Sequence, residues 1–489
     1  MYKLVGTLFL TAFLTACGGS NSNEPSPNPN PSPDQFSQLR TTIEQDLTSN
    51  NTAAISIAIY QEGDVVFAEA FGEKVNGTGE PVTTDTLFQL GSTTKMFTAV
   101  STLQLIEQGS ITLDDNLVNV LPQIQYPGDQ ALDWQGIEIQ HLLTHQSGLR
   151  DSGLQSNEEL KNYMKAVYPQ RSRLMNPPGL FHNYSNPNWS YLGALIEELS
   201  GVGFDEYVKT NIFDDLGMTR SAVGRSGAVA DGNYALGYQA LDPNEPGTYV
   251  TNISQIPETT VGHPAGTETW STPTEQLKMA EFLLNGNESI LGNEFREQLT
   301  TAHVSEDFGG LPVNYGYGIY INEGFNNDEA WYPIRNWNHG GNTLSYTSVF
   351  YVFPDLDIAI SIMSSGAFSE LTPTLLAALD AVTTLPASTE LPLIPNEPTK
   401  YVKHEGVYTT ESFTFIIEAE GNNLTITIPE LDSMPQPIPY ERELAHFGDD
   451  TFFAEIGGEV SYLTFIPIEA NGESVYIRNR ELVAIKDGY

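Results

Sequence analysis

Two pairs of apolar, β-rich runs lie far apart in the chain, and their placement constrains the fold more than any other feature. The first pair, residues 53–60 and 64–72, flanks a Gln-Glu-Gly sequence at 61–63 that is typical of a hairpin turn. The second pair lies at 346–354 and 358–365, after a long stretch with helical patterns. Strands at both ends with helices between them predict an α+β domain, in which one antiparallel sheet gathers the early and late strands.

Three segments of this domain, which we place at residues 36–385, have the apolar spacing of helices. The first segment opens the domain and has its apolar residues at Phe36, Leu39, Ile43 and Leu47. The second, at 91–109, is apolar on most sides and ends in a glycine, which predicts a buried helix. The third, at 271–286, has Thr272 as its predicted N-cap, and Glu275 would complete a capping box.

The apolar period changes to two after a Pro-rich stretch at 386–397, which we interpret as a linker. Two alternating runs follow on either side of a turn at 421–423, with apolar residues at Phe413, Phe415, Ile417, Leu424, Ile426 and Ile428. A Gly-Gly pair at 457–458 and an Asn-Gly pair at 471–472 predict two more hairpin turns. Residues 398–489 therefore predict a second, antiparallel β domain.

The charge balance excludes one large class of functions. The chain has 489 residues, with 62 acidic and 21 basic side chains and a net charge of −41 at pH 7. A surface this acidic repels nucleic acids, so we expect no nucleic-acid partner. Hydrophobic residues make up 40% of the chain, which is enough for packed cores and argues against disorder. Solubility in a salty or exposed medium explains the acidity, and a cationic substrate is the alternative.

Residues 1–17 have the pattern of a bacterial export signal. Lys3 precedes an apolar run at 4–14 that is too short to span a bilayer as a mature helix. The run leads into Leu-Thr-Ala-Cys17, which resembles the lipobox of bacterial lipoproteins, and this resemblance implies a diacylglyceryl anchor on Cys17. The alternative is a plain signal peptide with an incidental cysteine. Residues 18–35 are rich in Pro, Ser and Asn, and we interpret them as a flexible tether.

These features predict an exported lipoprotein, anchored to a membrane with its folded body in the periplasm or at the cell surface. The acyl chains, rather than surface charge, would hold such an acidic protein at the membrane. Cys17 is also the single cysteine of the chain, which excludes an internal disulfide and a cysteine-rich metal site.

A serine and a lysine three residues apart open the predicted helix at 91–109. Ser92 and Lys95 would lie on one helix face, one turn from each other. A serine at a helix N-terminus meets free backbone N–H groups, and a desolvated lysine can be neutral and accept the serine proton. An N-cap serine followed by a surface lysine would give the same pattern. The apolar residues that follow favour the catalytic interpretation, because they place the pair at the end of a buried element.

Two further short motifs could complete a site around Ser92. In Tyr184-Ser-Asn186, a tyrosine held as phenolate by cations could act as a general base, and the asparagine could bind a substrate amide. In His339-Gly-Gly341, glycines at a strand edge let a ligand approach the backbone, and an N–H there could complete an oxyanion hole. Each motif alone also fits a structural interpretation, a capped loop for the first and a glycine turn for the second.

The three motifs in this order resemble the marks of the serine β-lactamase and penicillin-binding-protein superfamily, which are S-x-x-K, S/Y-x-N and K/H-x-G. The best match is the class C-like branch, which holds AmpC-type β-lactamases, D,D-peptidases, D-aminopeptidases and β-lactamase-fold esterases. Segments 137–149, 213–221 and 339–348 are similar to that branch as well. The likeness covers residues 36–385, and the C-terminal domain looks like the lipocalin-like domains of D-aminopeptidase-type members.

The resemblance implies a role for each motif residue. Ser92 would be the acylated nucleophile, with Lys95 as its base partner and Tyr184 as the proton shuttle. The backbone N–H groups of Ser92 and Asn342 would form the oxyanion hole. The implied substrate-binding residues are Asn186, His339, Gly341 and Asn342. Such a site needs no metal and no other cofactor.

The third motif departs from the penicillin-type Lys-Thr-Gly, whose cation and hydroxyl hold a substrate carboxylate. Gly340 has no hydroxyl, and His339 replaces the permanent cation with an imidazole that can be neutral. We therefore expect neutral esters or amides to be preferred over β-lactams. The predicted function is a serine hydrolase, an esterase or D-amino-acid peptidase, acting on a small-molecule or peptide substrate. The alternatives are a class C-like β-lactamase and a non-catalytic penicillin-recognising sensor or scaffold.

Two features allow more than one interpretation. His141 and His145 are four residues apart and could be paired metal ligands, but no third ligand is indicated, so we expect hydrogen bonding near the site instead. The C-terminal domain could be a lid or specificity element over the active site, or an accessory domain without substrate contact.

Overall fold

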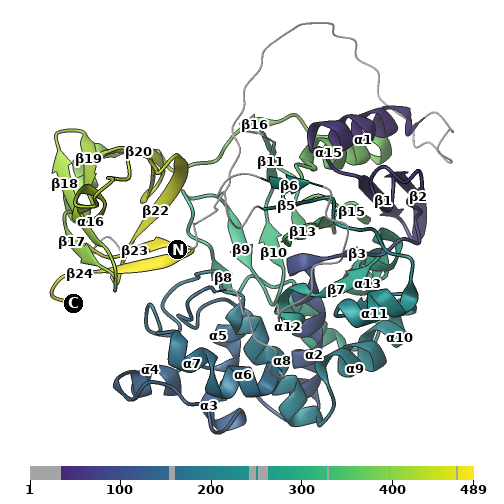
Figure 1. The fold of residues 1–489 in the computed structure, drawn as a ribbon, viewed down its shortest axis with the longest axis horizontal. Coiled ribbons are helices and arrows are strands. Elements are labelled where there is room, and N and C mark those ends of the chain that lie inside the picture. Colours follow the sequence, from purple (N-terminus) through teal and green to yellow (C-terminus); the bar gives the residue numbers. More distant parts are fainter. Residues whose placement is uncertain are drawn as a thin grey trace, which may run out of the picture.

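The computed structural model describes residues 35–152, 160–241, 249–251, 263–327, 330–395, 397–469 and 472–489. These residues form a large α+β domain with a smaller β-barrel beside it (Figure 1). The predicted export signal with Cys17, and almost all of the tether, lie outside the described residues. Within the described ranges, no helix has both the length and the apolar character needed to cross a bilayer.

Eight antiparallel strands form the main sheet of the large domain. Their order across the sheet is β2 (Asp64–Gly72), β1 (Ala54–Gln61), β15 (Ile358–Ser364), β14 (Thr347–Phe353), β13 (Asn336–Asn342), β10 (Tyr320–Asn322), β9 (Val313–Tyr315) and β8 (Val304–Ser305). β1 pairs with β15, with Ile57 opposite Ile362, so the prediction that one sheet gathers the early and late strands is confirmed.

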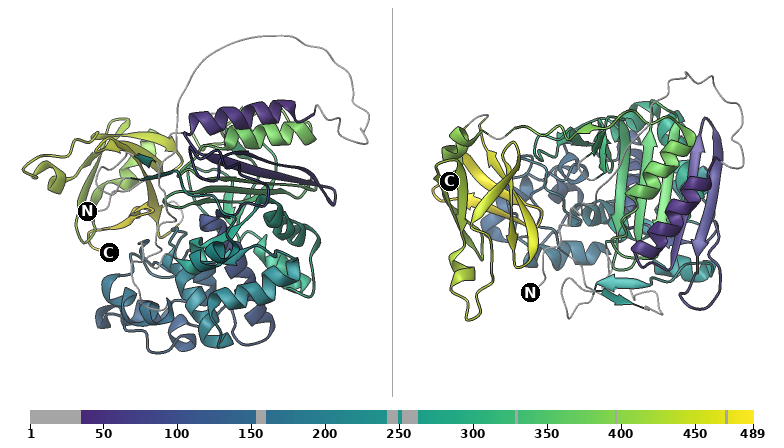
Figure 2. Two further views of the ribbon diagram at one scale, coloured as in Figure 1. Left: turned by 45° about the vertical axis from the view of Figure 1, so that its right-hand side comes forward. Right: turned by 90° about the horizontal axis from the view of Figure 1, so that it is seen from above.

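Helices cover both faces of this sheet (Figure 2). They include α1 (Ser37–Ser49), α15 (Thr372–Val382), α2 (Lys95–Glu107) and α13 (Pro273–Asn285). On one face α1 and α15 pack against Ile55, Ile57 and Ile59 of β1. On the other face Ala58 and Tyr60 join a core that includes α2 and α13. Because β1 is buried on both sides, its sequence is a nearly continuous apolar run.

Shorter elements complete the large domain. The remaining helices are α3 (Leu117–Val120), α4 (Ala131–Gln135), α5 (Ile139–Leu143), α6 (Leu160–Ala166), α7 (Tyr168–Arg171), α8 (Pro187–Ser200), α9 (Phe204–Val208), α10 (Asp214–Leu216), α11 (Arg225–Asp231), α12 (Pro264–Thr267) and α14 (Asn293–Leu299). The short strands are β3 (Phe88–Gln89), β4 (Ala222–Val223), β5 (Gln239–Leu241), β6 (Tyr249–Thr251), β7 (Thr269–Ser271), β11 (Phe325–Asn327), β12 (Ala330–Tyr332) and β16 (Thr389–Glu390). β16 belongs to the predicted linker and pairs with β12, so this segment is held against the large domain.

Two helix starts differ in detail from the prediction. Residues 91–94 form a 3-10 turn before α2, so Ser92 precedes the α-helix instead of lying within it. Thr272 caps α13 as predicted, and its hydroxyl oxygen accepts a hydrogen bond from Glu275 N at 3.2 Å. The Glu275 carboxylate accepts instead from Arg220 N and the Ser221 hydroxyl. The predicted capping box is therefore wrong in its second half, because a tertiary contact takes the glutamate.

The C-terminal domain is a closed barrel in which eight antiparallel strands pair in chain order. The strands are β17 (Gly406–Thr409), β18 (Thr414–Glu420), β19 (Asn423–Thr427), β20 (Glu443–Gly448), β21 (Thr451–Ile456), β22 (Glu459–Pro467), β23 (Ser474–Asn479) and β24 (Leu482–Lys486). A 3-10 helix, Pro398–His404, precedes them, and α16 (Pro429–Asp432) follows β19. Alternating residues such as Phe415, Ile417 and Ile426 fill the interior, which confirms the predicted β domain.

Apolar and polar contacts attach the barrel to the large domain. Tyr476 of β23 packs on Phe181 with ring centroids 5.5 Å apart. Arg478, two residues later in the same strand, is 7% exposed. Its guanidinium donates hydrogen bonds to the carbonyl of His182 and to both carbonyls of residues 306–307. The β23–β24 hairpin is thus fixed against the large domain.

Candidate active site

The turn that carries Ser92 packs tightly against the end of β13. Gly91 has φ +59°, and a Cβ added there would lie 2.8 Å from Asn342 N and 3.0 Å from the carbonyl carbon of Gly341. Glycine is therefore required both for the backbone conformation and for the close approach. This contact places the half-buried Ser92 beside the end of the strand that carries the third motif.

Lys95 lies fully buried behind Ser92 at the start of α2. Its Nζ is 3.0 Å from Ser92 Oγ, 2.8 Å from Asn186 Oδ1 and 3.0 Å from the carbonyl oxygen of Gly266. The amide and carbonyl oxygens can only accept, so they take the two hydrogens of a neutral amine and leave its lone pair for the Ser92 hydroxyl. Burial lowers the pKa of Lys95 well below 10.5, which favours this neutral form.

Tyr184 completes the hydrogen bonding of Ser92 from the other side. Its hydroxyl donates to Ser92 Oγ at 2.9 Å. The ring stacks on His145 with centroids 4.2 Å apart, and the Cζ of Arg480 lies 4.5 Å from the ring centroid. Burial raises the pKa of Tyr184 above its usual value of 10.0, although Arg480 opposes that rise. The hydroxyl is therefore protonated at rest, which argues against the phenolate base that we considered from the sequence.

Asn186 is held between Lys95 and an acidic side chain. Its Oδ1 faces Lys95 Nζ, while its backbone N and Nδ2 donate to Oδ1 of Asp151 at 2.9 and 3.3 Å. Because the carboxylate only accepts, Asp151 fixes which end of the amide points at the lysine. The structure thus ties Asn186 directly to Lys95.

His339 lies within β13 rather than in a turn, and it is 2% exposed. Its Nδ1 is 2.6 Å from the carbonyl oxygen of Gly340, which can only accept, so Nδ1 carries the proton and Nε2 accepts from the Tyr315 hydroxyl at 3.2 Å. Burial, and then the charge of Lys95, lower the pKa of His339 to about 3. The imidazole is neutral near pH 7, and both its nitrogens are already bonded within the protein.

The end of β13 presents a backbone N–H toward the turn that carries Ser92. Thr343 N donates to the carbonyl of Tyr346 at the β13–β14 hairpin. Since antiparallel pairing alternates, the preceding residue, Asn342, points its N–H away from β14 and toward the side where Gly91 packs. A side chain at Gly341 would overlap the carbonyl of Leu90. This geometry is suitable for an oxyanion hole made of the N–H groups of Asn342 and the nucleophile itself.

A protein-family model described as Beta-lactamase matches residues 39–384, well over half of the chain. The chain belongs to the beta-lactamase family. It is therefore a member of a serine hydrolase family, and the motif residues described above lie within the matched region.

Individual relatives agree with this family. A beta-lactamase from Yersinia enterocolitica is 28% identical over 215 residues, which are 42% of this chain and 52% of that protein. The octameric penicillin-binding protein homologue from Pyrococcus abyssi has a TM-score of 0.61 at 24% identity, covering 92% of this chain and 100% of its own. The D-amino acid amidase from Ochrobactrum anthropi SV3, complexed with D-phenylalanine, has a TM-score of 0.57 at 19% identity, covering 70% of this chain and 99% of its own. The chain spans about half the length of the curated relatives it matches.

Three residues of the site are absent from the motifs by which the sequence resembles the beta-lactamase family. Asp151 holds Asn186, Gly266 supplies a carbonyl to Lys95, and Arg480 comes from the barrel. Asp151 lies two residues after the family-like segment 137–149, which is a weak signal in the sequence. A hairpin-tip arginine in an arginine-poor chain is the corresponding signal for Arg480.

His141 and His145 each have hydrogen-bond partners of their own. His141 Nδ1 accepts from Glu138 N at 3.1 Å near the start of α5. His145 lies beyond that helix, where it stacks on Tyr184 and its Nδ1 accepts from Ser185 N at 2.9 Å. Among the described residues, no three His, Cys, Asp or Glu side chains are grouped as a metal site would require.

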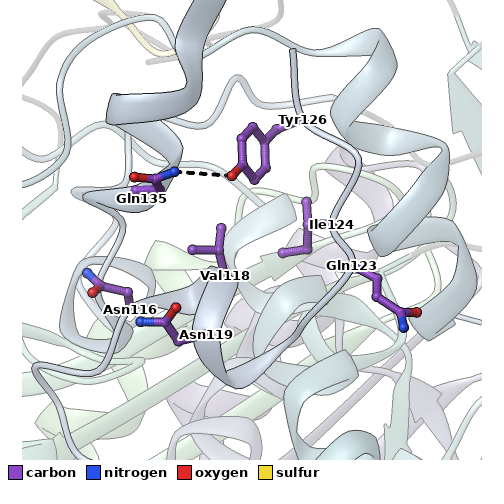
Figure 3. Close-up of a pocket in the computed structure, with 7 residues that line it drawn as sticks. All are labelled: Asn116, Val118, Asn119, Gln123, Ile124, Tyr126 and Gln135. Atoms are coloured by element: carbon purple, nitrogen blue, oxygen red, sulfur yellow. Dashed lines mark hydrogen bonds between the residues drawn. The ribbon is translucent and has the colours of Figure 1, made fainter. Parts of the chain in front are cut away.

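A cavity of about 420 Å³ lies elsewhere in the large domain (Figure 3). Its lining includes Asn116, Asn119, Gln135 and Tyr126, and Gln135 Nε2 donates to the Tyr126 hydroxyl at 3.3 Å. Apart from the Tyr126 hydroxyl, its lining consists of amide and apolar side chains, so it has no counterpart of the Ser92–Lys95 pair.

Proposed function

We propose that this beta-lactamase family member cleaves esters or amides through an acyl-enzyme on Ser92. The observation that carries the proposal is the position of Ser92 Oγ between Lys95 Nζ, 3.0 Å away, and the Tyr184 hydroxyl, 2.9 Å away. The proposed nucleophile thus has a base and a second proton donor within hydrogen-bond distance of its oxygen.

In acylation, Lys95 accepts the Ser92 proton while Oγ attacks the carbonyl carbon of the substrate. The carbonyl oxygen becomes an oxyanion that the N–H groups of Ser92 and Asn342 stabilise. The bond to the leaving group then breaks; the leaving alcohol or amine takes a proton from Tyr184, which regains one from Lys95. A water molecule attacks the resulting ester in the second half, and Ser92 recovers its proton as the acid leaves.

The third motif favours a neutral ester or a D-amino-acid amide over a β-lactam. His339 is neutral and bonded within the protein, and Gly340 offers no hydroxyl. The charge and the donor that hold a carboxylate in penicillin-type members are both missing from this strand. The D-amino acid amidase among the structural relatives supports a D-configured acyl group.

A class C-like β-lactamase is the second candidate, and the Yersinia relative, whose name is beta-lactamase, favours β-lactam hydrolysis. A screen of the purified protein on p-nitrophenyl acetate, a D-alanyl p-nitroanilide and a chromogenic cephalosporin separates the candidates. We expect a burst and then steady turnover of the first two substrates. Cephalosporin hydrolysis with kcat/KM of roughly 10⁶ M⁻¹s⁻¹ or more would favour the β-lactamase instead.

Two variants show whether the reaction belongs to this site. Ser92→Ala should remove the burst and the turnover, while Ser110→Ala, an exposed serine beyond α2, should keep both. A stoichiometric burst without turnover would identify a penicillin-recognising sensor rather than an enzyme. Reaction that persists unchanged in Ser92→Ala would contradict the proposal.

We also propose that Cys17 carries a lipid anchor and that the folded body lies outside the cytoplasm, in the periplasm or at the cell surface. The support is the lipobox-like sequence, with the single cysteine of the chain at the position where lipid would attach.

A further inference from the structure

A residue of the barrel reaches the catalytic network of the large domain. Arg480 lies at the tip of the β23–β24 hairpin, and its Nε and Nη2 donate to Oδ2 of Asp151 at 3.0 and 2.7 Å. The same guanidinium lies 4.5 Å from the ring centroid of Tyr184. We propose that Arg480 is a positioning residue of the active site, contributed by the barrel, which holds Asp151 and through it the Asn186 amide that contacts Lys95.

The two oxygens of Asp151 have separate partners. Oδ2 accepts from Arg480, and Oδ1 accepts from the backbone N and Nδ2 of Asn186. With its Nδ2 held there, Asn186 turns Oδ1 toward Lys95 Nζ at 2.8 Å. A continuous chain of hydrogen bonds therefore runs from the barrel to the base of the nucleophile.

The hairpin that carries Arg480 is rigidly placed. Two residues earlier, the buried Arg478 donates to the carbonyl of His182 and to the carbonyls at 306–307. Asn183 Nδ2 donates to the carbonyl of Arg480 itself at 3.4 Å. These contacts hold the backbone that carries Arg480, and from it the half-exposed side chain reaches Asp151.

The position of Arg480 also affects the pKa of Lys95 through its charge. Among the residues that the structure describes, the titratable or charged groups that face Lys95 are Asp151, Tyr184, His145, His263, His339 and Arg480. Burial lowers the pKa of His263 to about 4 and that of His145 well below 6.5, and His339 is neutral as described. The charged neighbours are thus Asp151, which favours the ammonium form of Lys95, and Arg480, which opposes it.

The inference rests on the proposed function, because it assumes that Lys95 is the base. Its test is the rate at which a fluorophosphonate labels Ser92, measured against pH. In that reaction Oγ bonds to phosphorus, fluoride leaves and the serine proton passes to Lys95, so the rate rises as Lys95 becomes neutral. No knowledge of the natural substrate is required.

Arg480→Gln removes the cation that faces the Asp151 carboxylate. The unpaired carboxylate then stabilises the protonated form of Lys95. We expect the acidic limb of the pH–rate profile to move to higher pH, and labelling at pH 7 to fall roughly tenfold or more. Arg480→Lys keeps the charge and should stay closer to the wild type. The double variant Arg480→Gln/Asp151→Asn removes both charges, so the acidic limb of its pH–rate profile should return toward the wild-type pH. Its fold should also be more stable than that of Arg480→Gln, because no unpaired carboxylate remains.

Arg442 provides a matched control within the barrel. It pairs with Asp432 at 2.9 and 3.0 Å and lies 5.1 Å from the Tyr440 ring centroid, and these partners all belong to the barrel. Arg442→Gln should leave the labelling profile unchanged. Two results would overturn the inference. One is slower labelling of Arg480→Gln while the acidic limb of its pH–rate profile stays at the wild-type pH. The other is a double variant whose acidic limb does not return toward the wild-type pH. Failure of the wild type to react at Ser92 would overturn the proposed function itself.

Discussion

At the scale of single residues, burial decides which group accepts the Ser92 proton. Lys95 is fully buried and its pKa is lowered, whereas burial raises the pKa of Tyr184. The amine is therefore ready to accept a proton, and the phenol is ready to donate one. This assignment divides acid and base roles between the two sides of the nucleophile.

Lys95→Ala and Tyr184→Phe should each lower kcat for ester hydrolysis by roughly 10²- to 10⁴-fold, the usual scale for loss of an acid or base. Steady-state rates on p-nitrophenyl acetate measure the effect. Tyr126→Phe, which removes a hydroxyl that accepts from Gln135 far from the motif residues, should keep the wild-type rate. A wild-type rate in either site variant would exclude that residue from the mechanism.

The third motif allows a change of substrate preference to be tested. His339→Lys with Gly340→Thr would restore a cation and a hydroxyl, and a Cβ at Gly340 meets only Ser348 O at 4.0 Å. We expect the ratio of cephalosporin to neutral-ester kcat/KM to rise. A charged hydrogen bond contributes about 1.5–3 kcal/mol when its geometry is right, so the gain is limited. An unchanged or lower ratio would show that this strand does not set the preference.

The residue motifs of the site could be predicted, but the protonation state of Tyr184 could not. Spacing placed Ser92 and Lys95 one turn apart, and the structure brings Oγ and Nζ to 3.0 Å. The protonation of Tyr184 depends on the burial that distant segments provide, which spacing does not report. Arg480 was not predicted for a related reason, because it belongs to the barrel and contacts Asp151 across the domain boundary.

At the scale of elements, the contact between the 91–94 turn and β13 is the feature that sets the nucleophile. A substitution of Gly91 by alanine would strain a φ of +59° and press a Cβ to 2.8 Å from Asn342 N. The backbone strain alone costs about 1–2 kcal/mol. The overlap would also displace the N–H that we assign to the oxyanion hole.

Gly91→Ala should therefore lower both the free energy of unfolding and kcat. Gly109→Ala is its matched control, because Gly109 has φ +72° but an added Cβ would meet nothing within 4 Å. Denaturant unfolding and ester hydrolysis are measured for both variants. Gly109→Ala reports the backbone strain alone, and Gly91→Ala reports the strain together with the overlap of Cβ and Asn342 N. Equal retention of activity in both variants would contradict the role of this contact.

Elements with local patterns could be predicted, and those that depend on tertiary partners could not. The hairpin of β1 and β2 and the barrel alternation follow from apolar period and turn residues, and both are confirmed. β16 was not predicted from its Pro-rich sequence, because it forms a strand by pairing with β12 of the large domain. The Glu275 carboxylate does not complete the predicted capping box for the same reason, because Arg220 N and the Ser221 hydroxyl donate to it instead.

At the scale of the whole molecule, the barrel and the large domain meet at the proposed active site. The 92% coverage by the Pyrococcus homologue exceeds residues 39–384, so the likeness of fold extends into the barrel. The sequence left open whether this domain contacts the site, because packing between domains has no local pattern. The ion pair of Arg480 with Asp151 places the barrel next to the catalytic residues.

The membrane anchor is a second property of the whole chain. Cys17→Ser should block lipid attachment and leave a precursor or a soluble protein, because the acyl chains provide the membrane affinity. Phase partitioning of cell extracts in detergent measures the change. If the variant still enters the detergent phase as the mature wild type does, Cys17 is not the site of lipidation.

The central claim is that Ser92 carries the acyl group during turnover. Acid quenching of the wild type during hydrolysis of a D-alanyl ester, followed by peptide mass spectrometry, tests it most directly. We predict a D-alanyl mass increment on the peptide that contains Ser92, which disappears as the substrate is consumed and is absent from Ser92→Ala. An increment on another residue, or turnover with the Ser92 peptide unmodified at every time point, would contradict the account.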